Sequence, residues 1–134
     1  MIVQEVLPEG SIELWAPELR SELQAYPVST DVGQRLLFEN DLYRFWSISL
    51  NPGERLPFHR HTRDYTWTCV QPGVALTRYG TGDVYRVEYQ RGDLDFYNHQ
   101  SKGDFLHDLE NIGETRLEFV TTEFVDQRVG GGKA

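Results

Sequence analysis

The stretch GERLPFHRHTRDYTWTCVQPG, residues 53–73, decides the fold and the chemistry of this 134-residue chain. His59 and His61 stand one residue apart in a segment that has the pattern of a β-strand. Because side chains alternate between the two faces of a strand with a period of two, the two imidazoles project to the same side. One metal ion can therefore reach both rings.

Short apolar segments separated by turn signals surround this stretch and indicate an all-β domain. Aromatic residues make up 13% of the chain, and 12 glycines and 6 prolines interrupt the apolar runs. Trp46, Ile48 and Leu50 alternate with serines, as in a half-buried strand. Ten strands are expected, at 2–7, 35–39, 42–50, 55–61, 65–70, 74–79, 84–89, 93–97, 106–109 and 115–124. So many short strands predict a sandwich or a jelly-roll barrel.

One short helix is expected before the barrel. Ala16-Pro17-Glu18 suits a first helical turn, since proline is tolerated there and an acidic side chain complements the helix dipole. Leu19 and Leu23 share a face that can pack against the sheet. The helix should end near Tyr26, before Pro27.

The length of the chain fits a single domain that spans residues 1–134. Its expected parts are an N-terminal arm with the helix at 1–34, the barrel at about 35–125 and a flexible tail at 126–134. The tail ends in VGGGKA, which offers nothing that would hold it to the barrel.

Charge and cysteine content limit the partners and the compartment. Thirteen basic residues against twenty-one acidic ones give a formal net charge of −8, which opposes binding to nucleic acid or to an anionic membrane. The single cysteine, Cys69, has no partner for an internal disulfide, which suggests a reducing compartment. Residues 1–7 lack the features of a signal peptide, and no apolar run has the length of a membrane span. The expected location is the cytoplasm.

The third metal ligand has to come from elsewhere in the chain, since a divalent metal in a protein takes three or four ligands. The remaining histidines are His99 and His107. His107 opens a short strand in which it shares a face with Leu109 and Asn111, and it is the expected ligand. His99 lies in a polar loop, NHQSKGD, and is the weaker candidate.

These histidines lie at spacings that resemble those of a small single-domain cupin. Gly53, His59, His61 and Gly73 match the first cupin motif, and Gly92, His107 and Asn111 match the second. The resemblance covers roughly residues 35 to 125. It implies a double-stranded β-helix with a metal site formed by His59, His61 and His107.

The sequence departs from the cupin pattern in three places. The glutamate of the first motif falls on Thr66, residues 98–100 replace the P-x-G of the second, and about four residues are inserted before His107. If Thr66 faces inward, three neutral imidazoles leave the metal its full 2+ charge. Such a site should favour an anionic or enolisable ligand. It resembles the iron sites of thiol and diketone dioxygenases of the cupin superfamily.

The HRHxxDY run, from His59 to Tyr65, also resembles small cupins linked to β-alanine degradation. Several other residues are candidates for the surroundings of the metal or for the substrate pocket. The candidates are Asp64, Thr66, His99, Arg44, Arg78 and Tyr97. Either arginine can pair with a neighbouring acid or meet a substrate carboxylate.

The other face of the strand at 65–70 carries Tyr65, Trp67 and Cys69. If Thr66 points inward, this face points outward, and exposed aromatic residues need a cover. The alternatives are packing against another element of the chain and a homodimer interface. The homodimer is the expected assembly.

Three classes of function remain open, because cupins host many unrelated activities. The first is a non-haem iron dioxygenase or related oxidoreductase that acts on a small anionic carbonyl compound or acid. Fe(II) is then the expected metal, with zinc, manganese or nickel as alternatives. The second is a metal-dependent isomerase, lyase or hydrolase without oxygen chemistry. The third is a cupin that binds a small molecule and does not transform it.

Overall fold

A computed structural model describes residues 1–25 and 28–126. All ten expected strands are present, with ends that lie within two residues of those expected. The strands are β1 (Ile2–Leu7), β2 (Arg35–Glu39), β3 (Tyr43–Leu50), β4 (Arg55–His61), β5 (Tyr65–Gln71), β6 (Gly73–Arg78), β7 (Val84–Tyr89), β8 (Leu94–Tyr97), β9 (Phe105–Asn111) and β10 (Leu117–Phe124).

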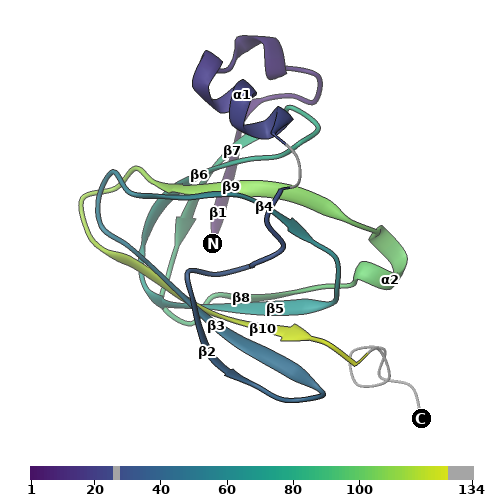
Figure 1. Ribbon diagram of the computed structural model, residues 1–134. Helices are drawn as coiled ribbons and strands as arrows, with labels where there is room; N and C mark the ends of the chain where they lie inside the picture. Colours follow the sequence, from purple (N-terminus) through teal and green to yellow (C-terminus); the bar gives the residue numbers. More distant parts are fainter. Residues whose placement is uncertain (26–27, 127–134) are drawn as a thin grey trace.

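The strands form two antiparallel five-stranded sheets that face each other (Figure 1). The first sheet has the order β1-β7-β6-β9-β4, and the second has the order β2-β3-β10-β5-β8. Most neighbours in each sheet are distant in sequence, as in a jelly roll, where the chain crosses repeatedly between the sheets. The all-β jelly-roll prediction is confirmed.

A hydrophobic core lies between the two sheets. Trp46, Ile48 and Leu50 of β3 are buried, as their alternation with serines predicted. Asn111 at the end of β9 is fully buried, and its side-chain amide donates to the carbonyl oxygens of Leu50 and Thr115. It thereby holds the chain that leads into β10. The buried members of this core are Ile48, Leu50, Leu56, Cys69, Ala75, Leu109, Leu117 and Phe119.

The N-terminal helix α1 (Pro17–Gln24) packs on the outer face of the first sheet (Figure 1). Trp15, just before the helix, stacks on Phe58 of β4, with ring centroids 5.8 Å apart. Leu19 and Leu23 pack against the same small cluster, so the expected contact between helix and sheet is confirmed. The expected helix end near Tyr26, before Pro27, lies outside the described residues, as does the tail from residue 127 onward.

Charged groups attach α1 to the sheet as well. Glu22 accepts two hydrogen bonds from the Arg55 guanidinium, at 2.7 and 3.0 Å, and a third from the backbone N–H of Phe58. Arg55 also donates to Asp108, which is completely buried. Such bidentate, charge-assisted contacts fix the orientation of a helix as well as adding stability.

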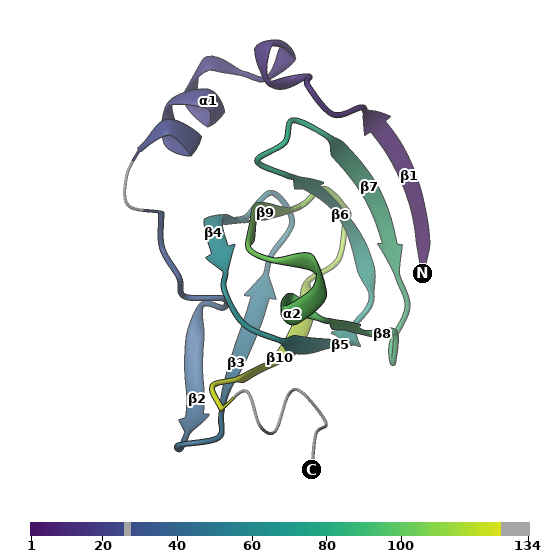
Figure 2. The ribbon, with the colours of Figure 1, turned by 90° about the vertical axis from the view of Figure 1, so that its right-hand side faces the viewer.

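A second helix, α2 (His99–Lys102), occupies the segment that was expected to be a loop, and a 3-10 turn spans Ile12–Leu14. Asn98 caps α2 by accepting from the N–H of Ser101, and Gly103 ends it with a positive φ of 78°. The helix uses part of the insertion before His107 and lies across one end of the barrel (Figure 2). Within the described residues, the helices are all too short or too polar to span a lipid bilayer.

Candidate metal centre

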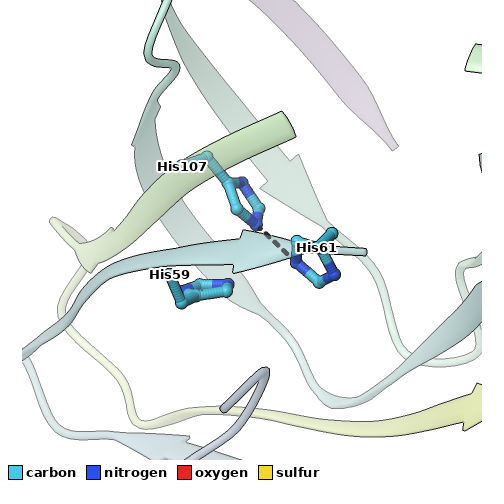
Figure 3. Close-up of side chains that lie close together, drawn as sticks. All are labelled: His59, His61 and His107. Carbon is cyan, nitrogen blue, oxygen red and sulfur yellow. Dashed lines mark hydrogen bonds between the residues drawn. The ribbon is translucent and has the colours of Figure 1, made fainter. Parts of the chain in front are cut away.

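Three histidines from two strands meet inside the barrel (Figure 3). His59 and His61 lie on β4, and His107 lies opposite His59 in the antiparallel register of β4 and β9. One ring nitrogen from each residue lies within 4.8 Å of the corresponding nitrogens of the other two. These three residues can hold one metal ion.

A register shift in β4 turns the histidines inward. The pairing with β9 is irregular between Leu56 and His59, where the chain passes through Pro57 and Phe58. Leu56 lies in the core between the sheets, whereas Phe58 packs outward against the helix side. A bulge inserts one residue and thereby reverses the alternation of faces, so that His59 and His61 follow Leu56 into the barrel.

Hydrogen bonds fix the tautomers of two of the rings. The Nδ1 of His59 lies 2.9 Å from the carbonyl oxygen of Pro57, which can only accept, so Nδ1 carries the proton. The Thr77 hydroxyl donates to the carbonyl oxygen of Asp108 and therefore accepts from Nδ1–H of His107, at 3.0 Å. In both rings Nε2 is left with its lone pair. Hydrogen-bond acceptors of this kind orient metal-binding histidines in proteins.

The third ring, that of His61, contacts His107 through its own Nε2. The Nε2 atoms of His61 and His107 are 3.1 Å apart. Because Nε2 of His107 is an acceptor, His61 donates Nε2–H to it when no metal is bound. The proton can move to Nδ1 of His61 when a cation takes its place, since Nδ1 is the other protonation site of a neutral imidazole.

The environment keeps all three imidazoles neutral. Burial lowers the pKa of His59 below its ordinary value of 6.5. Burial, together with the neighbouring imidazoles, places the pKa values of His61 and His107 well below it. Neutral imidazoles have the lone pairs that a metal needs.

The donor set fits a transition metal. Three neutral nitrogen donors suit zinc, iron, copper or nickel rather than calcium or magnesium, which prefer oxygen. With metal–nitrogen bonds of about 2.1 Å, two ligand atoms can be at most about 4.2 Å apart. The nitrogens, which lie within 4.8 Å of one another, therefore have to move closer together to bind one ion.

Tyr65, not Thr66, takes the inward position beside the histidines. The Tyr65 ring stacks on His61, with centroids 4.0 Å apart, whereas the Thr66 hydroxyl donates to the backbone oxygen of Asp95 on β8. The expected inward orientation of Thr66 is thus wrong, and so is the outward orientation of Tyr65 and Trp67, which both line the cavity. The first cupin motif allows either three or four residues between its second histidine and its glutamate. With three residues after His61, the position of that glutamate falls on Tyr65, as the structure has it.

Cys69 shares the inward face of β5 but lies below the cavity, in the core between the sheets. It is almost fully buried, and burial raises the pKa of its thiol. Of the two alternatives for this face, packing within the chain applies to Cys69, although it points into the core and not outward as expected.

A cavity of about 570 Å³ surrounds the histidines. Nine aromatic residues line it in addition to the three imidazoles. They are Tyr65, Trp67, Tyr79, Tyr85, Tyr89, Phe96, Tyr97, Phe105 and Phe119. Burial raises the pKa of Tyr79 to about 12 and places the pKa of Tyr65 well above its ordinary value, so both hydroxyls stay protonated at neutral pH.

The other predicted pocket residues fall into two groups. Tyr97 lines the cavity, and its hydroxyl donates to the backbone oxygen of Gly103. Asp64 is buried away from the cavity lining and accepts from the backbone N–H of His99, at 2.7 Å. The His99 ring pairs with Asp104, 2.6 Å away, and is not part of the lining.

Neither arginine reaches the cavity. Arg44 contacts Glu39 at 3.0 Å and Glu123 at 3.7 Å. Arg78 is held by Asp108 and Glu110, both at 2.7 Å. The role of either residue in binding a substrate carboxylate therefore finds no support, and each follows the other alternative, which is pairing with acids.

Sequence reasoning missed Thr77 and misplaced Tyr65. Nothing in the sequence near Thr77 signals its contact with His107, because β6 and β9 are 30 residues apart at this point. A signal for Tyr65 did exist. Tyr65, Trp67 and Cys69 form the more apolar face of β5, and the apolar face of a strand normally turns toward the core.

Comparisons with known proteins find relatives by structure alone. No family model matches the chain, and no curated protein does. A cupin domain from Bordetella pertussis Tohama I has a TM-score of 0.59 and 22% identity, over 67% of this chain and 88% of its own. An RmlC-like cupin family protein with a double-stranded β-helix fold from Methanocaldococcus jannaschii has a TM-score of 0.54 and 16% identity, over 75% and 89%.

A conserved protein with a double-stranded β-helix domain from Klebsiella pneumoniae, itself uncharacterised, has a TM-score of 0.53 and 20% identity, over 75% of this chain and 84% of its own. At these identities the likeness defines the fold. The chain has the double-stranded β-helix fold that is found in cupins, as the sequence resemblance implied. Its distinguishing feature is a cluster of three histidines, able to bind a metal, at the wall of an aromatic cavity.

Proposed function

We propose that this protein is a metal-dependent oxidoreductase of the dioxygenase type, with Fe(II) held by His59, His61 and His107. Zinc, manganese and nickel are the alternative metals. The observation that carries the proposal is the convergence of three neutral imidazoles at the wall of a cavity large enough for a substrate. When bound, iron supplies Lewis acidity and one-electron redox chemistry to a molecule in this cavity.

The residues around the histidines have separate tasks. The carbonyl oxygen of Pro57 and the hydroxyl of Thr77 orient His59 and His107. Tyr65 packs on His61 where other cupins have a carboxylate, so the protein adds no negative charge to the site. The aromatic lining makes the surroundings of the histidines less polar than bulk water, which strengthens electrostatic interactions with a bound substrate.

Acid–base chemistry has less support beside the three histidines, although the carboxylates of Asp83 and Asp95 are part of the cavity lining. An isomerase, lyase or hydrolase needs a side chain that moves a proton. Among the described residues, the aromatic rings that contact the histidines are those of Tyr65, Tyr79 and Phe105. Burial raises the pKa of both tyrosines, which makes them poor general bases at neutral pH. Redox chemistry at the metal asks for no such base.

The test begins with metal analysis of protein that is purified without an affinity tag. Protein loaded anaerobically with Fe(II) or with Zn(II) is then screened for oxygen uptake with small keto acids, diketones, thiols and phenols. Oxygen uptake with iron and none with zinc is the expected result. Turnover with either metal and without oxygen would establish the acid–base alternative. Tight binding without turnover would establish a binding protein.

The expectations of a homodimer and of a cytoplasmic location stay predictions. Since Tyr65 and Trp67 line the cavity, a homodimer has to use another surface. Phe38 of β2 and Leu94 of β8 are exposed on the edge strands of the second sheet, and such apolar groups support an association through that sheet. Sedimentation velocity of the purified protein gives the oligomeric state.

A further inference from the structure

We propose that the substrate is an uncharged aromatic compound, bound with its ring among the aromatic side chains of the cavity and its polar end toward the three histidines. This inference rests on the proposed function of the histidine cluster and names the class of molecule that the cavity selects. It replaces the small anionic substrate that the sequence suggested.

The aromatic side chains form two groups. One group surrounds the histidines: Tyr65 stacks on His61, Tyr79 lies nearly parallel to His107 at 5.4 Å, and Phe105 contacts both imidazoles. The second group lines another part of the wall and consists of Trp67, Tyr89 and Phe119.

The rings of the second group meet edge to face. Their centroids are 4.7 to 5.7 Å apart, and their planes cross at 83° to 89°. The three rings contact one another, and each of them also contributes to the cavity lining. Aromatic rings prefer such offset or edge-to-face neighbours, so this wall favours a planar ring over an aliphatic chain of the same size.

Apart from a metal bound at the histidines, the charged side chains of the cavity wall oppose an anionic group on the substrate. Among the residues that line it, the carboxylates are Asp83 and Asp95, and the single basic side chain besides the histidines is that of Lys102. The Lys102 ammonium lies 5.7 Å from the centre of the Tyr97 ring, on a helix at one end of the barrel. With Arg44 and Arg78 paired elsewhere, a substrate carboxylate inside the cavity would lose its hydration without gaining a guanidinium.

The volume fits this class of molecule. The cavity of about 570 Å³ lies within the range of about 300–1,000 Å³ that is usual for pockets that enclose a small organic ligand. Such a space has room for one or two fused rings with oxygen substituents. A two- or three-carbon acid has no aromatic surface to place against this wall.

Three probes that share a pair of adjacent hydroxyl groups separate the contribution of the aromatic ring to binding from that of a negative charge. They are catechol, which is neutral at pH 7, 3,4-dihydroxybenzoate, which adds a carboxylate, and cyclohexane-1,2-diol, which lacks the aromatic ring. Binding to the metal-free protein and to the Ni(II)-loaded protein is measured by titration calorimetry. Catechol should bind at least about tenfold more tightly than either of the other two, in both forms of the protein.

A pair of variants locates the preference. Trp67→Leu should weaken catechol binding about fivefold or more, whereas Phe45→Leu, which removes a ring outside the cavity lining, should leave it unchanged. Equal affinity for the three probes in wild-type protein, a preference for the benzoate or the diol, or no binding of catechol up to about 10 mM would overturn the inference. The probe comparison in wild-type protein does not depend on how well either variant folds.

Metal content, measured on the same samples, separates this inference from the proposed function. Protein that binds no metal but still prefers catechol would refute the proposed function and leave the aromatic substrate class standing. Protein that binds one metal ion but prefers the anionic or aliphatic probe would refute the aromatic substrate class and leave the proposed function standing.

Discussion

Thr77 accepts a hydrogen bond from His107 and donates its own hydroxyl proton in a hydrogen bond to the carbonyl oxygen of Asp108, at distances of 3.0 and 2.8 Å. The Thr77 hydroxyl thus bridges the backbone carbonyl of Asp108 and the imidazole of His107, which are neighbours on β9. This arrangement holds Nε2 of His107 toward the other two histidines, and it gives Thr77 a role in metal binding without any contact with the metal.

Replacement of Thr77 by valine should weaken metal binding. Valine has nearly the same shape but cannot accept from Nδ1–H, so His107 loses both its tautomer and its orientation, and the metal affinity should fall about 10- to 100-fold. Competition with a chromogenic chelator measures the affinity. Thr77→Ser keeps the hydroxyl and serves as the matched control. An unchanged affinity in the valine variant would mean that Thr77 does not position His107.

Alanine at position 59, 61 or 107 should abolish stoichiometric metal binding, because two remaining imidazoles hold a transition metal far more weakly than three. His99→Ala is the matched control, since the His99 ring pairs with Asp104 and does not line the cavity. Metal analysis of each variant after dialysis provides the measurement. A full metal complement in His107→Ala would exclude this residue as a ligand.

A carboxylate placed at residue 65 should restore the charge that the site lacks. Tyr65→Glu brings an anionic oxygen beside His61, and the affinity for a divalent metal should rise about tenfold or more. The metal-free variant should be less stable by about 2–4 kcal/mol, because the buried ring is lost and a charge takes its place. Calorimetric titration and thermal unfolding measure the two effects.

Thr66→Glu is the control for Tyr65→Glu, because it places the same carboxylate on the other face of β5. Thr66 contacts β8 through its hydroxyl and is not part of the cavity lining, so a carboxylate there should leave the metal affinity within about twofold of wild type. A larger gain from Thr66→Glu than from Tyr65→Glu would show that the inward face of β5 has been assigned incorrectly.

The ion pair between Glu22 and Arg55 should make the free energy of unfolding depend on pH in the acidic range. Burial raises the pKa of Glu22, but the hydrogen bonds from Arg55 and from the N–H of Phe58 outweigh it, so the pKa in the folded protein lies below 4.5. The stabilisation is therefore present above pH 4.5 and is lost as the pH falls through the lowered pKa.

Glu22→Gln removes this titration while it keeps the size of the side chain. The free energy of unfolding of the variant should be lower by about 1 kcal/mol at pH 7 and should converge with that of wild type as the pH falls below the lowered pKa of Glu22. Urea unfolding at a series of pH values tests this. A constant difference between the two proteins over the whole range would rule out Glu22 as the titrating group.

The sequence determined the fold and the identity of the three histidines. Turn residues at short intervals gave the strand boundaries to within two residues, and the alternation in β3 identified its buried face. These signals are local, and local periodicity depends on the backbone geometry of a strand, which is the same in every protein. The spacing of His59, His61 and His107 was enough to indicate a shared site.

Tertiary structure decided which neighbours these histidines have. The bulge before His59 reverses the faces of β4, Tyr65 rather than Thr66 points inward, and Thr77 reaches His107 from a strand 30 residues away. A shift of one residue moves every following side chain to the opposite face of its strand, and only the pairing with other strands fixes that shift. The chemistry of the cavity, aromatic and nearly free of basic groups, follows from these pairings.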